Sequence, residues 1–76
     1  MSAGELEATL REILAAHLEV PAGAEAPLDL ASLSLVVVAE ELEARFGFVV
    51  AARELVAANF GSLAALVGYC GRKTAR

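Results

Sequence analysis

The sequence has few of the residues that build disulfides, metal centres or enzyme active sites. It contains one cysteine, Cys70, and one histidine, His17, among its 76 residues. A single cysteine cannot form an internal disulfide, and one cysteine with one histidine provides too few ligands for a zinc site. Such cysteine usage is typical of a reducing compartment, so we expect a cytoplasmic protein.

Aromatic residues and long apolar runs are also scarce. Tryptophan is absent and aromatic residues make up 5% of the chain, whereas hydrophobic residues make up 58%. A core of leucine, valine and alanine suits closely packed helices. The longest apolar run is too short to span a bilayer, and the acidic N-terminal segment is unlike a signal peptide. We therefore expect one soluble domain over residues 1–76, too small for a deep catalytic pocket.

Basic residues are scarce before the last six positions. Residues 1–70 contain all ten acidic residues but only three arginines, and the final GRKTAR carries the other three positive charges. An acidic body argues against binding to nucleic acid, which requires lysine and arginine to replace counterions. It favours partners with basic surfaces.

Hydrophobic spacing predicts a first helix near the N-terminus. Ser2 followed by Glu5 is the pattern of a capping box. The inner face repeats at helical spacing through Leu6, Leu10, Ile13, Leu14, His17 and Leu18. On that face the histidine is expected to pack against neighbours rather than act as a base. Pro21 restricts the residue before it, so the helix is expected to end near Glu19.

A loop is predicted over residues 20–31, which contain two prolines and a glycine. The loop is long for a connection between helices, and long ordered loops are often functional. We expect Leu28 and Leu30 to tuck under the helices and tether it.

The segment after this loop predicts a second helix. It is expected to begin at Ser32 or Leu33 and to end at Phe46, with Gly47 as a left-handed stop. Its expected core stripe is Leu35, Val38, Ala39, Leu42 and Phe46. Three further apolar residues lie outside that stripe, and a single buried face does not explain them: Leu33, Val36 and Val37.

The last third of the chain predicts a short helix and then a longer one. The short helix is expected near Ala51–Ala57, and a turn at Asn59–Gly61 follows it. Ser62 is expected to cap the last helix and Gly71 to end it, with residues 72–76 as a frayed basic tail. The inner face of that helix comprises Leu63, Leu66, Val67 and Cys70. The predicted fold is thus all-α, a small four-helix bundle of three main helices and one short helix.

No set of residues has the pattern of an active site. Nucleophilic catalysis requires a base within reach of the nucleophile and a group that orients the base. The acidic residues Glu40, Glu41 and Glu43 are expected to lie on an exposed helix face as solvated charges. We therefore expect that the chain is not an enzyme. Two roles remain open for Ser32. It could be the N-cap of the second helix or the attachment point of a chemical group.

The stretch LDLASLSLVVVAEELEARFG, residues 28–47, resembles the modification motif of acyl and peptidyl carrier proteins. The residues that carry the resemblance are Leu28, Ser32, Leu33, Leu42, Glu43, Phe46 and Gly47. The later stretch ELVAANFGSLAALVGYC is similar to the short third helix and capped fourth helix of that family. The resemblance covers essentially the whole domain, in order.

This resemblance implies that Ser32 carries a 4'-phosphopantetheine arm transferred from coenzyme A by a separate phosphopantetheinyl transferase. The arm would hold an acyl or aminoacyl group as a thioester, loaded by a ligase or acyltransferase and used by downstream biosynthetic enzymes. Two positions depart from the family pattern. Ala31 stands where the family has aspartate or histidine, and Val37 stands where it often has an acid.

The carrier interpretation also assigns a docking face to the second helix. Leu33, Val36 and Val37 would form an apolar collar around the arm with residues near Val49 and Val50. Glu40, Glu41 and Glu43 would form an acidic rim that steers basic partners. We expect a free-standing monomeric carrier of secondary metabolism that contacts neither membrane nor nucleic acid. The alternatives are a cofactor-free helical interaction module and a fatty-acid acyl carrier protein.

Overall fold

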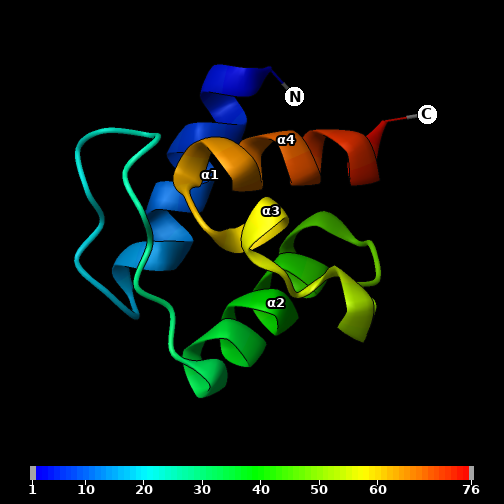
Figure 1. Cartoon of the computed structure of the whole chain (residues 1–76). Helices are drawn as coiled ribbons and strands as arrows, with labels where there is room; N and C mark the ends of the chain where they lie inside the picture. The colour runs from blue at the N-terminus through cyan, green and yellow to red at the C-terminus, as the bar shows by residue number, and fades with distance from the viewer. Residues whose placement is uncertain (1, 76) are drawn as a thin grey trace.

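Helices order most of the chain in the computed structural model, which describes residues 2–75 (Figure 1). The elements in chain order are α1 (Ala3–Ala15), α2 (Ser32–Phe46), the 3-10 turn η1 (Ala52–Glu54), α3 (Ala57–Phe60) and α4 (Leu63–Thr74). Within the described residues there is no strand, and the one extended pairing is an isolated bridge between Pro27 and Ser62. The fold is the small all-α four-helix bundle that the sequence predicts. In residues 2–75 no helix has both the length and the apolar character needed to cross a membrane.

Helix α1 begins as predicted but ends earlier than predicted. The Ser2 hydroxyl accepts the Glu5 N–H (3.2 Å) and the Glu5 carboxylate accepts the Ser2 N–H (2.9 Å), which completes the capping box. The helix ends at Ala15 because its last turn tightens, and the His17 N–H bonds the Leu14 carbonyl three residues back. The predicted end near Glu19 is therefore wrong.

Helix α2 has the predicted bounds and the predicted buried face. Val38, Ala39 and Leu42 are buried, whereas Leu35 and Phe46 pack against the core from its edge. Gly47 ends the helix with a φ of 77°, in the left-handed region that favours glycine.

The core lies where α1, α2 and α4 meet, and α3 lies between α4 and α2 (Figure 1). Its fully buried side chains are Leu10, Leu14, Leu42, Leu63, Leu66, Val38 and Cys70. Burial raises the pKa of the Cys70 thiol to about 11, as suits a structural rather than a reactive cysteine. The core is therefore mainly aliphatic, with Phe60 and Tyr69 as its buried aromatic side chains.

The segment from residue 51 to residue 61 differs from the prediction. A single short helix over Ala51–Ala57 is wrong, because Val56 is extended (φ −129°, ψ 159°) and separates η1 from α3. Asn59 lies within α3 rather than in a turn, and its side-chain amide donates to the Glu54 carbonyl (2.9 Å).

Helix α4 is capped by Ser62 as predicted, since the Ser62 hydroxyl accepts the Ala65 N–H (3.1 Å). The helix continues past Gly71 to Thr74, so the predicted end is wrong, and residues 72–74 form a helical turn rather than a frayed tail. Arg72 donates to the Asn59 side chain (3.2 Å), and Lys73 also binds a side chain of the preceding segment. These tertiary bonds hold the last turn; position 76 of the predicted tail lies outside the described residues.

The loop between α1 and α2 is docked on the bundle. The Leu28 N–H donates to the Gly61 carbonyl (2.8 Å), and the Ala24 carbonyl accepts the Ala64 N–H (2.7 Å). Arg11 closes the start of the loop by donating to the carbonyls of residues 21 and 22, each at 2.9 Å. Leu28 is buried and Leu30 is half-buried, as predicted. These contacts fix the chain that leads into α2.

Candidate functional site

Ser32 is the first residue of α2 and its side chain is exposed. The N-cap position belongs to Ala31, whose backbone is extended, and no side chain among the described residues caps this end of the helix. The interpretation of Ser32 as an N-cap is therefore wrong. The Ser32 hydroxyl therefore does not cap the helix, and its oxygen is available to form a covalent bond to another group.

The backbone at the start of α2 is suited to an anion. The first intrahelical bond runs from the Leu35 N–H to the Ala31 carbonyl (2.8 Å), so the N–H groups of residues 32–34 have no carbonyl within the helix to bond. The first turn contains no acidic residue that would offset the positive end of the helix dipole. Asp29 is exposed in the preceding loop. A phosphate bound to the Ser32 oxygen would lie beside these groups.

Of the predicted apolar collar, the structure brings two members together on an exposed face of α2. Leu33 is 77% exposed and Val36 is 44% exposed, and their spacing of three residues places them on the same side of the helix. Val37 is half-buried. Val49 is exposed in the segment after α2, but Val50 packs against the core and is not an open docking residue.

The three residues of the predicted acidic rim differ in what they bind. The Glu41 carboxylate bonds His17 Nε2 and joins the end of α1 to α2. The Glu43 carboxylate accepts the Val50 N–H (2.7 Å) and holds the chain after the helix. Glu40 is exposed, and within residues 2–75 it alone of the three makes neither a hydrogen bond nor an ion pair. Two of the three therefore bind groups of their own chain, although the Glu41 side chain remains 42% exposed.

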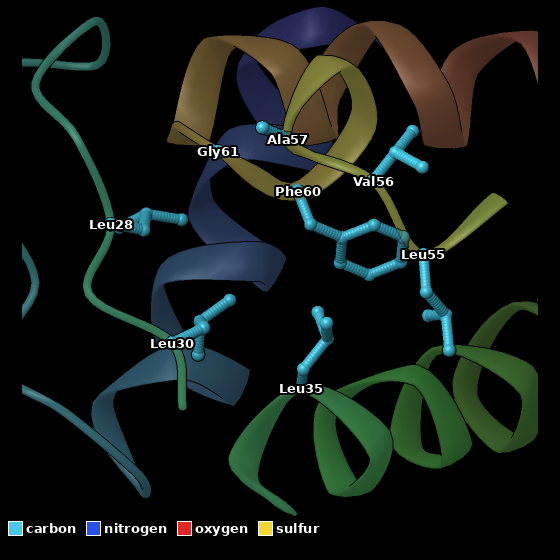
Figure 2. A pocket seen from close by; sticks show the side chains of 8 residues that line it. All are labelled: Leu28, Leu30, Leu35, Leu55, Val56, Ala57, Phe60 and Gly61. Atoms are coloured by element: carbon cyan, nitrogen blue, oxygen red, sulfur yellow. The ribbon is translucent and has the colours of Figure 1, made fainter. Parts of the chain in front are cut away.

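An apolar cavity of about 190 Å³, partly open to solvent, lies between the loop, α2 and the η1–α3 segment. Figure 2 shows Leu28 and Leu30 on the loop, Leu35 on α2, and Leu55 and Phe60 on the opposite side. The full lining is Leu28, Leu30, Leu35, Leu55, Val56, Ala57, Phe60 and Gly61. The sequence pattern does not predict this cavity, although the two leucines of the loop, Leu28 and Leu30, indicate an apolar surface beneath it.

A cluster of polar bonds around Glu54 was also missed. Its carboxylate accepts the Ala51 N–H (2.9 Å), the Tyr69 hydroxyl (3.0 Å) and Lys73 Nζ (3.1 Å). The bond from the Ala51 N–H, followed by that from Lys73, lowers the pKa of Glu54 below its ordinary value. Burial and then the Glu54 carboxylate raise the pKa of the Tyr69 hydroxyl. No sequence spacing indicates this cluster, because it joins residues that are far apart along the chain.

The described residues contain no group of three or more histidine, cysteine, aspartate or glutamate side chains placed to hold a metal ion. Comparison with family models, with curated proteins and with solved structures finds no match to this chain. Two features of the molecule indicate a functional site: the N-terminus of α2 with its exposed serine, and the apolar cavity lined in part by that helix.

Proposed function

We propose that the chain is an acyl carrier protein that holds biosynthetic intermediates as thioesters on a 4'-phosphopantetheine arm attached to Ser32. One observation carries the proposal: the Ser32 hydroxyl is exposed at the uncapped N-terminus of a 15-residue helix. The free backbone N–H groups of that turn fit the phosphodiester of such an arm. The arm supplies the thiol on which an acyl group is carried.

The chain's own part in the attachment is to present the serine oxygen, which would become the ester oxygen of the phosphodiester. The new bond would form to the phosphorus next to the pantetheine, the pyrophosphate bond of coenzyme A would break, and 3',5'-ADP would leave. Loss of the hydroxyl proton requires a base, and the only histidine, His17, is bonded to Glu41, which lies further along α2 than Ser32. The base is therefore expected on the phosphopantetheinyl transferase. This division of roles agrees with the proposal that the chain is not itself an enzyme.

The cavity favours an acyl cargo over an aminoacyl cargo. All of its lining side chains are apolar, and Leu30 and Leu35 lie within three residues of Ser32 along the chain. Each methylene of an aliphatic chain that leaves water for such a site contributes about 0.8 kcal/mol. The ammonium group of an aminoacyl cargo would instead lose its hydration without a partner. A short aliphatic acyl group is thus the cargo that the molecule could shelter.

Partner enzymes would dock by apolar contact on Leu33 and Val36, which adjoin the serine, with the half-buried Val37 and the exposed Glu40 at the edge of the contact. These partners are the transferase, a loading ligase or acyltransferase, and downstream enzymes. Glu41 would contribute less to this face than Glu40, since its carboxylate binds His17, although its side chain is 42% exposed. The proposed setting is a cytoplasmic, monomeric carrier in secondary metabolism, with fatty-acid synthesis as the alternative setting.

The test is the intact mass of the protein after co-expression with a transferase of broad specificity. A gain of one phosphopantetheine that is absent in Ser32→Ala, and retained in the matched control Ser34→Ala, is expected. Ala31 at the N-cap favours a second candidate, a helical interaction module without a cofactor. An unchanged mass with several transferases would reject the carrier and support that module.

A further inference from the structure

One wall of the apolar cavity is made by a segment with little regular structure. Leu55 and Val56 connect η1, which has three residues, to α3, which has four. Val56 is 47% exposed, so this wall lies at the surface of the molecule. The opposite walls are firmer, because Leu35 belongs to the long helix α2 and the N–H of Leu28 bonds the Gly61 carbonyl.

The two ends of this segment are fixed. Before η1, the Val50 N–H donates to the Glu43 carboxylate on α2 (2.7 Å). After Val56, Phe60 is buried, with its ring centroid 5.3 Å from that of Tyr69 on α4. A movement of the wall is therefore confined to the residues between these anchors.

The backbone bonds between the anchors do not reach the rest of the bundle. The N–H groups of Glu54, Leu55 and Val56 all donate to carbonyls within residues 51–54. Two side chains link this stretch to α4. The Glu54 carboxylate accepts the Tyr69 hydroxyl (3.0 Å) and Lys73 Nζ (3.1 Å), and the Asn59 side chain accepts from Arg72 (3.2 Å). Glu54 directly precedes Leu55 and Val56, whereas Asn59 lies within α3. The Lys73 ammonium also lies 5.8 Å from the Phe48 ring centroid, which keeps it beside the carboxylate.

From this arrangement we propose that Glu54 is a latch: its bonds to Tyr69 and Lys73 hold Leu55 and Val56 in place as the movable wall of the cavity. When the latch opens, the stretch between Val50 and Phe60 moves outward and the cavity becomes accessible from that side. Glu54 is thus a positioning residue for the cavity. The role in admitting an acyl chain rests on the proposed function, but the latch itself does not.

Amide hydrogen exchange of the unmodified full-length chain tests the latch, whether or not Ser32 accepts an arm. Glu54→Gln keeps the shape of the side chain and removes its charge. Loss of the charge-assisted bonds is expected to accelerate exchange of the Leu55 and Val56 amides by about tenfold. Tyr69→Phe, which retains the aromatic ring, is expected to give a smaller acceleration at the same two amides. It provides the test of the latch if Glu54→Gln does not fold.

The matched control is Ser2→Ala, which removes the cap of the distant helix α1. It is expected to accelerate core amides of α1 by about fivefold through global unfolding and to leave the Leu55 and Val56 amides unchanged. The latch is refuted if Glu54→Gln and Tyr69→Phe leave these two amides unchanged. It is equally refuted if Ser2→Ala accelerates them as much as it accelerates α1, since the segment would then open only with the whole chain.

Discussion

Gly61→Ala should destabilise the protein strongly, because this glycine lies where the loop, α3 and α4 meet. A Cβ atom at this position would lie 2.5 Å from the Ala57 carbonyl oxygen and 3.2 Å from its carbon, and both are backbone atoms. The carbonyl of Gly61 also accepts the Leu28 N–H (2.8 Å), so a shift of the backbone would loosen the loop that leads into α2. Overpacking of this kind costs about 1–3 kcal/mol of unfolding free energy.

Urea unfolding followed by far-UV circular dichroism measures this cost, and thermal melting provides a second estimate. For a domain of this size the melting temperature should fall by about 4–8 °C for each kcal/mol lost. The matched control is Gly23→Ala in the same loop, where a Cβ atom would have no neighbour within 4 Å. The control should change stability by no more than about 1 kcal/mol, in the stabilising direction. Equal changes in unfolding free energy for the two substitutions would refute the close packing of Gly61 against Ala57.

Two further predictions concern docking and acid stability. Val36→Asp should abolish docking of a transferase or loading enzyme while leaving the melting temperature unchanged, whereas Val37→Asp should also lower the melting temperature because Val37 is half-buried. Titration calorimetry and thermal melting test this pair, and a stable Val36→Asp that still docks would contradict it. The lowered pKa of Glu54 means that its stabilisation is fully present above its ordinary value of 4.5 and is lost as the pH falls through the lowered pKa. The difference in unfolding free energy between the native chain and Glu54→Gln should therefore shrink in acid, and a difference independent of pH would contradict this assignment.

The open end of α2 could be predicted in part from residues 28–47. The position of Ser32 at the start of a helix follows from local pattern, and the structure confirms the bounds of that helix. Which residue takes the N-cap does not follow from the pattern, because serine is a favourable cap and alanine is not. The backbone geometry decides it, since Ala31 is extended and Ser32 is already helical. The role of Ser32 as an attachment point stays a prediction.

The charged residues illustrate the limit of local reasoning about a site. A helix face with Glu40 and Glu41 next to one another looks uniformly acidic in the sequence. The structure distinguishes them, because Glu41 binds His17, which follows α1, and Glu40 does not bind a partner within residues 2–75. The cavity was likewise hidden from the sequence, since its walls come from three segments that only the fold brings together.

By itself the sequence determined the features that depend on neighbours a few residues apart. These are the capping box at Ser2, the cap at Ser62, the left-handed stop at Gly47 and the buried stripe of α2. Each depends on hydrogen bonds or spacing within one turn of helix, which the residue types alone specify.

Only the tertiary structure decided where α1 and α4 end and how residues 51–61 fold. The physical reason is that partners distant in sequence compete with local preference at those points. His17, just after α1, binds Glu41 on α2. Arg72 binds Asn59 and Lys73 binds Glu54, and these two contacts stabilise the turn of α4 that follows Gly71. The free energy of such contacts depends on where the backbone brings two segments together, and no spacing along the chain encodes it.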